Sequence, residues 1–160
     1  MLSVITQPEG EAAALTGLLS DLVPAAVKGL VRDVLVLDPG NQDDDLAVLC
    51  EASGARRISG GLGVAVRQAR SDLLLLASPG LRLDSFALDR LERVLADLGA
   101  EGLGRGVAVT APAPLGLGFL ARPKGLVTAR AHLLGVAAGT GLEAALAHAA
   151  KGAFRLQVAG

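Results

Sequence analysis

The 160-residue chain contains no tryptophan, no tyrosine and only three phenylalanines. Proteins that bind single-stranded nucleic acid stack bases on aromatic side chains, and binding to the phosphate backbone needs an excess of basic residues. In this chain 15 Lys and Arg residues accompany 16 Asp and Glu residues, which gives a net charge of −1. The composition therefore excludes nucleic acid from the expected partners.

Cysteine is also scarce. Cys50 is the single cysteine, which excludes a disulfide framework and a cysteine-based zinc site. It lies in the apolar segment LAVLCEA, so we expect it to be a buried small hydrophobic side chain.

The chain lacks a long uninterrupted apolar run as well. The longest stretch without a charged side chain, 106–121, is broken by Pro112, Pro114 and several glycines, so it is not expected to cross a bilayer as a helix. No basic segment precedes an apolar run near Met1, as a secretory signal requires. These features predict a cytoplasmic protein without a transmembrane segment.

Hydrophobic residues make up 51% of the chain, in short β-branched runs that alternate with longer segments of helical period. Strands are predicted at 2–6, 34–38, 56–58, 73–77, 107–110, 126–128 and 154–158. Helices are predicted at 11–22, 43–53, 60–71, 85–98, 129–138 and 142–151, the first of them stopped by Pro24. This alternation predicts an α/β fold, a three-layer sandwich with a mostly parallel central sheet, in a single domain over 1–160.

Ligands of such sheets bind at the carboxyl ends of the strands. The segments expected at that edge are 6–10, 38–43, the residues after Ala77 and the loop after Thr110. Asp38 ends a buried strand there, where a carboxylate can accept hydrogen bonds from a ribose or a base. Asp-Pro-Gly is also a favourable turn sequence, so a ligand role and a turn-forming role both stay open for Asp38.

Other catalytic patterns are weak or absent. The sequence Gly61-Leu62-Gly63 precedes a predicted helix but lacks the third glycine of a dinucleotide fingerprint. No Walker loop occurs, the two histidines His132 and His148 lack the spacing of metal ligands, and no serine has a neighbouring histidine signature.

Three segments, in this order and spacing, resemble the nucleotide-binding half of family 2 glycosyltransferases. They are SVITQPEGEAAAL at 3–15, GLVRDVLVLDPGNQDD at 29–44 and SDLLLLASPGLRL at 71–83. The later segment ARPKGLVTARAHLLGV at 121–136 is similar to a family segment close to the active site. The resemblance implies a GT-A fold of the nucleotide-diphospho-sugar transferase type, and a nucleotide-sugar as donor.

The resemblance also implies nucleotide-binding residues. Glu11 falls on an acidic residue of the family, and Gly10 replaces its asparagine. Asp38, Gly40 and Asp43 match the family motif V-V-D-x-G-S-T-D, which would make Asp38 the residue that contacts the nucleotide base.

The chain departs from the family at two places. The metal-binding Asp-x-Asp that follows the fourth strand of the family is replaced by Ala77-Ser78-Pro79, so the ligands of the expected Mg²⁺ or Mn²⁺ are missing. Of the late Glu-Asp pair that supplies the acceptor-activating base, only Glu143 remains, and an ordinary first-turn helical glutamate is the other interpretation of it. Residues 1–100 then form a nucleotide-binding half and 101–160 a reduced acceptor-side half.

The first functional hypothesis is a small, divergent family 2-like glycosyltransferase. Glu143, or an acid from another subunit, would act as base, and Arg122 or Lys124 would stabilise the leaving phosphate without a metal. The donor would be bound by Glu11, Asp38, Gly40 and Asp43.

The second hypothesis is a catalytically inactive GT-A-like domain retained as a binding or assembly module. The missing aspartates favour it, and so do the apolar outer faces of the helices near 12–22 and 131–150. Those faces predict a homo-oligomer or, at greater cost, peripheral membrane contact. A nucleotidyltransferase is less favoured, because the loop QPEGE after the first strand is acidic rather than basic.

Overall fold

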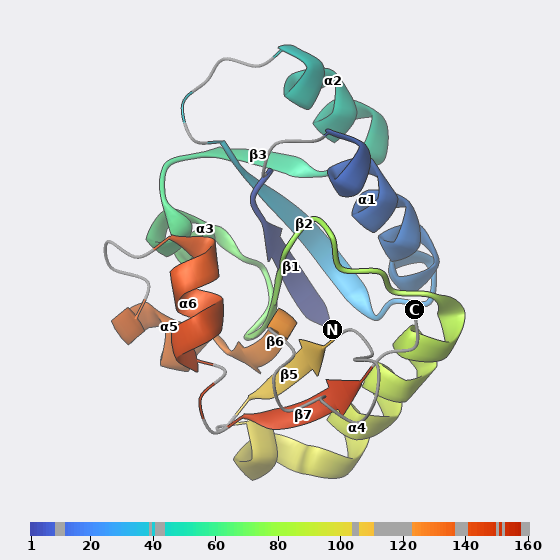
Figure 1. Ribbon diagram of the computed structural model, residues 1–160, viewed down its shortest axis with the longest axis vertical. Helices are drawn as coiled ribbons and strands as arrows, with labels where there is room; N and C mark the ends of the chain where they lie inside the picture. The colour runs from blue at the N-terminus through green and yellow to red at the C-terminus, as the bar shows by residue number, and fades with distance from the viewer. Residues whose placement is uncertain are drawn as a thin grey trace, which may run out of the picture.

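The computed structural model describes residues 1–8, 12–38, 40, 44–103, 106–110, 123–136, 141–149, 151 and 153–157. These residues form a seven-stranded sheet with helices on both faces (Figure 1). The strands are β1 (Leu2–Thr6), β2 (Val31–Asp38), β3 (Arg56–Ser59), β4 (Leu73–Ala77), β5 (Val107–Thr110), β6 (Pro123–Ala129) and β7 (Phe154–Gln157). The helices are α1 (Ala12–Val27), α2 (Asp44–Ser53), α3 (Leu62–Gln68), α4 (Ser85–Leu103), α5 (Arg130–Val136) and α6 (Leu142–Ala149).

The strand order is β3-β2-β1-β4-β6-β5-β7, and β6 alone of these strands runs against its neighbours. The predicted mostly parallel sheet is therefore confirmed. Since β1, β2, β3 and β4 are parallel, their carboxyl ends lie at one edge. Because β6 is antiparallel to β4, it starts at that same edge, where Gly125 pairs with Ala77.

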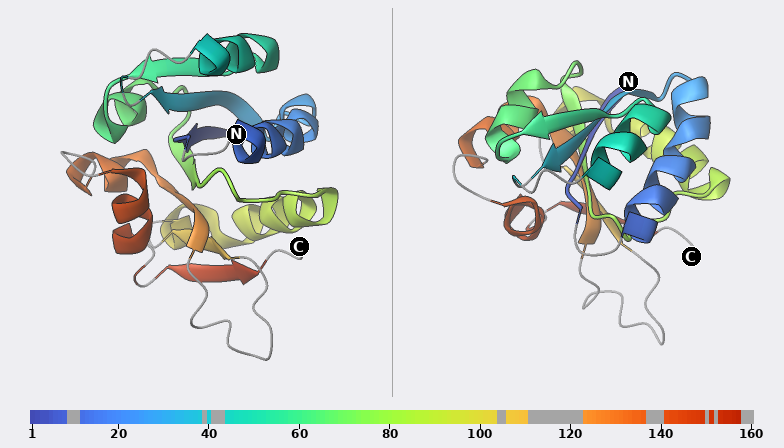
Figure 2. Two further views of the ribbon diagram at one scale, coloured as in Figure 1. Left: turned by 45° about the horizontal axis from the view of Figure 1, so that its top comes forward. Right: turned by 90° about the horizontal axis from the view of Figure 1, so that it is seen from above.

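The helices form two layers, which the turned views of Figure 2 separate. Helices α1, α2 and α4 pack on one face of the sheet, and α3, α5 and α6 pack on the other. Leu18, Leu22 and Leu88 bury the first layer against β1, β4 and β5, whereas Leu62, Leu133 and Leu146 bury the second. Each layer removes apolar strand and helix surface from water, the main favourable contribution to the fold. The structure is the three-layer α/β sandwich that the alternation predicts.

Helix α1 continues through Pro24 to Val27, so the predicted stop at Pro24 is wrong. A proline inside a helix loses one backbone hydrogen bond and crowds the preceding turn. Here Leu22 and Ala25 on either side of it are both buried against the sheet, and this packing keeps the last turn helical. The carbonyl of Pro24 still accepts a 3.0 Å hydrogen bond from the Lys28 N–H.

Other boundaries agree with the sequence in part: β2 begins at Val31, before the predicted 34–38, and α4 ends at Leu103, beyond the predicted 85–98. Strands β4 and β5 have the predicted bounds, while β6 is longer than the predicted 126–128 because both of its neighbours pair with it. Helix α3 ends at Gln68, because Ala69 has an extended backbone. Cys50 is buried, as predicted, in a cluster with Leu15 and Leu46.

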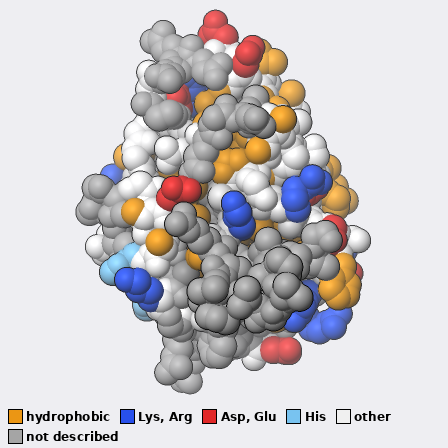
Figure 3. Space-filling view, in the orientation of Figure 1, with side chains coloured by type: hydrophobic (Ala, Val, Ile, Leu, Met, Phe, Trp, Pro, Cys, Tyr) orange, Lys and Arg blue, Asp and Glu red, His pale blue; other side chains and the backbone are white. Residues whose placement is uncertain are grey.

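Two surface properties follow from the described residues. None of their helices is both long enough and apolar enough to cross a membrane. Figure 3 shows acidic and basic side chains interspersed on one face, in keeping with the near-zero net charge.

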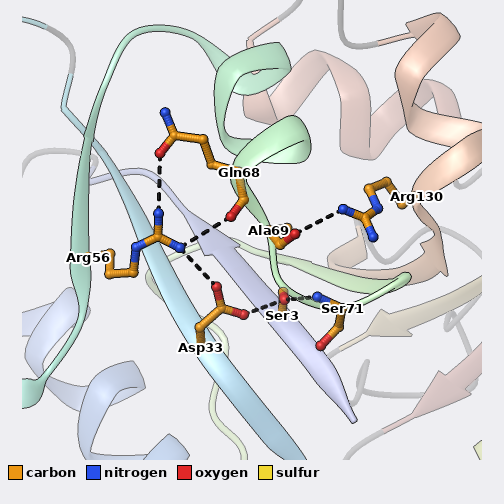
Figure 4. Close-up of polar contacts among 7 residues, drawn as sticks. All are labelled: Ser3, Asp33, Arg56, Gln68, Ala69, Ser71 and Arg130. Atoms are coloured by element: carbon orange, nitrogen blue, oxygen red, sulfur yellow. Dashed lines mark hydrogen bonds and ion pairs between the residues drawn. The ribbon is translucent and has the colours of Figure 1, made fainter.

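A polar network ties the sheet together at the amino ends of its strands, away from the expected ligand edge (Figure 4). Ser3 Oγ donates to Asp33 Oδ1 and accepts a 2.9 Å hydrogen bond from the Ser71 N–H. Arg56 Nη1 donates to Asp33 Oδ2 at 3.3 Å and to the Gln68 carbonyl at 3.2 Å. The network therefore links β1, β2 and β3 to the end of α3 and the start of β4.

We expect Asp33→Ala to destabilise the protein by about 2 kcal/mol, because it leaves the Ser3 hydroxyl and the Arg56 guanidinium without their shared acceptor. Urea denaturation measures this change. Asp72→Ala is the matched control: the Asp72 side chain is 94% exposed where it pairs with Arg130, so its loss should cost less than about 0.5 kcal/mol. Equal effects of the two substitutions would show that the network adds no stability of its own.

Candidate functional site

Asp38 lies at the carboxyl end of β2 and is 6% exposed. One of its oxygens, Oδ1, accepts a 3.0 Å hydrogen bond from the Gly40 N–H, and Gly40 has a positive φ of 97° that favours glycine. Its other oxygen, Oδ2, lies 2.8 Å from Arg57 Nε and 2.6 Å from Arg57 Nη2. The Gly40 N–H and then the Arg57 guanidinium hold the pKa of Asp38 below its ordinary value, so the carboxylate is ionised at neutral pH.

The Asp38 cavity is the hollow that surrounds this carboxylate. It has a volume of about 600 Å³ and is lined by Asp38, Gly40, Asp44, Arg57 and Ser59. Ser59 pairs with Asp38 across the β2–β3 ladder. The cavity thus combines carboxylate acceptors, guanidinium donors and the exposed backbone of Gly40. Asp38 both forms the turn and lines a cavity, so the two roles that the sequence leaves open are compatible.

Arg57 is a site residue that the sequence reasoning missed. The predicted strand 56–58 contains it, but the sequence alone does not say which strand lies next to Asp38. Parallel pairing of β3 with β2 brings Arg57 beside Asp38. A basic residue in the strand that follows a candidate carboxylate is the signal that could have identified it.

A second hollow, the Ser78 cavity, lies farther along the same edge of the sheet. Its volume is about 820 Å³, and its lining consists of Gln7, Ser78, Pro123, Lys124, Gly141, Leu142, Glu143, Ala144, Leu146 and Ala147. Thr6, at the end of β1, pairs with Val36 of β2 on one side and with Ala77 of β4 on the other. The ends of β2 and β4, and with them the two cavities, therefore flank the end of β1.

The structure brings only some of the candidate residues together. Lys124 and Glu143 line the Ser78 cavity, whereas Asp38 and Gly40 line the Asp38 cavity. Three candidates lie outside the described residues: Glu11, Asp43 and Arg122.

The residues that follow β4 do not fit a divalent cation. Mg²⁺ and Mn²⁺ prefer carboxylate and other hard oxygen ligands, while Ala77, Ser78 and Pro79 provide a single side-chain oxygen. Across the described part of the chain, no group of three or more His, Cys, Asp or Glu side chains could hold a metal ion. His132 and His148 are both exposed, on α5 and α6 respectively.

The sheet order and the two helix layers define a three-layer α/β fold with cavities at the carboxyl edge of its sheet. No protein-family model and no curated protein matches the chain. Solved structures do. Glucosyl-3-phosphoglycerate synthase of Mycobacterium tuberculosis matches with a TM-score of 0.67 at 17% identity, over 99% of this chain and 70% of that one.

The same enzyme in complex with Mn²⁺, uridine diphosphate and glucosyl-3-phosphoglycerate matches with a TM-score of 0.64 at 18% identity, with the same coverage. Mannosyl-3-phosphoglycerate synthase of Rubrobacter xylanophilus matches with a TM-score of 0.64 at 16% identity, over 99% of this chain and 66% of that one. At these identities the likeness establishes the fold, and it confirms the GT-A fold implied by the sequence resemblance.

The Asp38–Arg57 pair makes a prediction about acid stability. Because the pKa of Asp38 is lowered on folding, the ionised carboxylate stabilises the protein above its ordinary pKa of about 3.9, and that contribution is lost as the pH falls through the lower folded value. Arg57→Gln removes one of the two interactions that lower the pKa. We expect the variant to be less stable than the wild type at pH 6 and the two to converge in acid.

The free energies of unfolding of the wild type and of Arg57→Gln are measured by urea denaturation at a series of pH values, from 6 to the acid limit of the folded state. Lys151→Gln, which removes an exposed charge far along the chain, is the control for a general charge effect. A stability difference that stays constant with pH would mean that Arg57 acts through packing and not through the charge of Asp38.

Proposed function

We propose that the chain is a divergent family 2-like glycosyltransferase, which binds a nucleotide-sugar and transfers its sugar to an acceptor. The observation that carries this proposal is the pair of cavities at the carboxyl edge of a GT-A-like sheet, one built around the ionised Asp38 and the other around Ser78, Lys124 and Glu143. Their order along the edge suits a ligand with a base at one end and a sugar at the other.

The nucleobase belongs in the Asp38 cavity. An ionised carboxylate accepts a hydrogen bond from a ring N–H, and the adjacent Arg57 guanidinium can donate to a carbonyl oxygen of the same base. Backbone and the Ser59 hydroxyl complete the lining, and no tryptophan or tyrosine is present to stack on the base. Glu11, Gly40 and Asp43 remain assigned to nucleotide binding through the family resemblance, as part of a nucleotide-binding half at 1–100.

The sugar and the acceptor belong in the Ser78 cavity, with residues 101–160 as the acceptor-side half. Glu143 would take the proton from an acceptor hydroxyl while that oxygen forms a bond to C1 of the sugar. The bond from C1 to the diphosphate oxygen breaks, and the diphosphate leaves with the electron pair. Positive side chains, Lys124 and Arg122, would neutralise the leaving group, because the residues after β4 do not fit a divalent cation.

A non-catalytic binding or assembly module is the second candidate. The loss of the Asp-x-Asp motif favours it, and so does the exposure of large apolar side chains such as Val23, Val27 and Phe86. A second copy of the chain is the simplest cover for such side chains, and a membrane surface is the costlier one. The measurements below separate this candidate from the transferase.

Donor binding is tested by thermal shift with UDP, GDP and UDP-glucose, each with EDTA and with added Mn²⁺. We expect a nucleotide to stabilise the wild type, because a ligand that binds only the folded state raises its melting temperature. Asp38→Ala should abolish that shift by removing the acceptor for the base. Asp38→Asn, which keeps an acceptor for the Gly40 N–H, should weaken nucleotide binding more than tenfold.

Asp72→Ala is the control, because Asp72 is an exposed aspartate at the opposite edge of the sheet. A wild-type protein that is folded but is stabilised by none of these nucleotides would contradict donor binding. Unchanged binding by Asp38→Ala would contradict the role of Asp38.

Catalysis is tested with Glu143→Gln, followed as release of the nucleoside diphosphate from the donor in the presence of candidate acceptors. Loss of a general base lowers a rate by roughly 100-fold or more, while donor affinity should stay unchanged. Glu51→Gln, another exposed helical glutamate, is the matched control. Donor binding without any turnover in the wild type would select the non-catalytic module.

A further inference from the structure

The hydroxyl of Ser78 is buried without a partner. Ser78 follows β4 directly and is 7% exposed, and its Oγ has no hydrogen-bond partner among the described residues. A buried polar group without a partner loses its hydrogen bonds to water and gains none in return, so proteins rarely leave one in place. Ser78 also lines the Ser78 cavity.

The ammonium group of Lys124 lies close to Gly80, in the turn that follows Ser78. Lys124 lines the same cavity, and its Nζ lies 3.9 Å from the position that a Cβ on Gly80 would take. Its side chain is exposed, and among the described residues it has no ion pair. The charge of Lys124 is therefore not neutralised by a described carboxylate.

The backbone holds these two residues together. The Ser78 N–H donates a 2.8 Å hydrogen bond to the Lys124 carbonyl, which continues the β4–β6 ladder by one step. Gly125 permits this close approach: a Cβ there would lie 3.0 Å from Leu81 Cδ2 and 3.3 Å from the Leu76 carbonyl oxygen. The turn at 78–81, closed by the 2.9 Å bond from the Leu81 N–H to the Ser78 carbonyl, is thus seated tightly against β6.

The first turn of α6 lines the opposite part of the cavity, through Gly141, Leu142, Glu143 and Ala144. The first intrahelical bond of α6 joins the Ala145 N–H to the Gly141 carbonyl at 3.0 Å. The N–H groups before Ala145 have no carbonyl available within the helix, and they carry the positive end of its dipole. The N–H groups of this turn are hydrogen-bond donors in addition to those of Ser78 and Lys124. The charge of Glu143 offsets part of the positive potential at this end of the helix.

We propose that Ser78 and Lys124 form a diphosphate-binding site, in which an ammonium group and a hydroxyl take the place of a divalent cation. The proposal rests on the proposed function, because the ligand it names is the diphosphate of the nucleotide-sugar. It assigns a role to Ser78, the middle residue of the Ala77-Ser78-Pro79 segment that stands in place of the family's Asp-x-Asp motif. Binding of the nucleotide is then independent of divalent metal.

The charges support this arrangement. A diphosphate needs positive charge and hydrogen-bond donors close to its oxygens, and a lysine supplies up to three N–H donors together with its charge. An Asp-x-Asp pair at this place would repel the diphosphate unless a cation came between them. Ala77 and Pro79 stand where the two aspartates would, and Lys124 lines the same cavity, so both the repulsion and the need for that cation are removed.

The site is tested by calorimetric titration with UDP, uridine and inorganic pyrophosphate, in EDTA and with added Mn²⁺. Lys124→Gln should weaken UDP and pyrophosphate binding at least tenfold and leave uridine binding within twofold, since uridine lacks the diphosphate. Lys124→Arg should restore part of the loss. Lys151→Gln, another exposed lysine, should bind all three ligands as the wild type does.

Ser78→Ala separates ligand binding from a structural role. A hydroxyl that served the fold would lower the melting temperature of the free protein when removed. An unpartnered hydroxyl kept for a ligand should leave that temperature unchanged or raise it, while UDP binding weakens three- to tenfold.

The outcomes distinguish this site from the proposed function. UDP binding that requires Mn²⁺, or that is unchanged in Lys124→Gln, would overturn the diphosphate site and leave the nucleotide-sugar proposal standing. If the wild type binds pyrophosphate through Lys124 but binds no nucleotide, the anion site stands and the proposed function fails. Failure of the wild type to bind either UDP or pyrophosphate would overturn both.

Discussion

The antiparallel pairing of β6 with β4 is the constraint on which the candidate site depends. Because β6 alone among the described strands is reversed, it starts at the edge where the other strands end, and residues far apart in the sequence meet there. The register that pairs Gly125 with Ala77 places Lys124 next to Ser78, and the lack of a side chain at Gly125 lets Leu81 pack against β6. A shift of one residue would turn Lys124 to the other face of the sheet.

The same edge contains one charged group that is paired, Asp38, and one that is not paired with a described residue, Lys124. Asp38 is nearly buried and yet stays ionised, because Gly40 and Arg57 donate to both of its oxygens. Lys124 in the neighbouring cavity has no such partner among the described residues, so its charge is free to act on a ligand. Under the proposed function, the paired carboxylate would contact the base and the unpaired cation the phosphate of one nucleotide.

Much of the fold could be predicted from the sequence, because the period of the apolar residues along the chain is a local property. The runs at 73–77 and 107–110 gave β4 and β5 their bounds, and the alternation of strands and helices gave the fold class. Pro24 misled the prediction of α1, since burial of Leu22 and Ala25 outweighs the local cost of a proline. Asp38 was found because it ends a buried strand, whereas the contact of Arg57 with Asp38 and that of Lys124 with Ser78 depend on which strands are neighbours in the sheet.

By itself, the sequence determined the chemistry available at the ligand edge: an acid at the end of β2, an Ala-Ser-Pro segment in place of an Asp-x-Asp motif at the end of β4, and almost no aromatic surface. It also determined which segments would be strands and helices, since that depends on near neighbours. Only the tertiary structure decided that Arg57 neutralises Asp38, and that Lys124 lies beside Ser78. These contacts depend on strand order, direction and register, which are set by the packing of the whole sheet and not by any single segment.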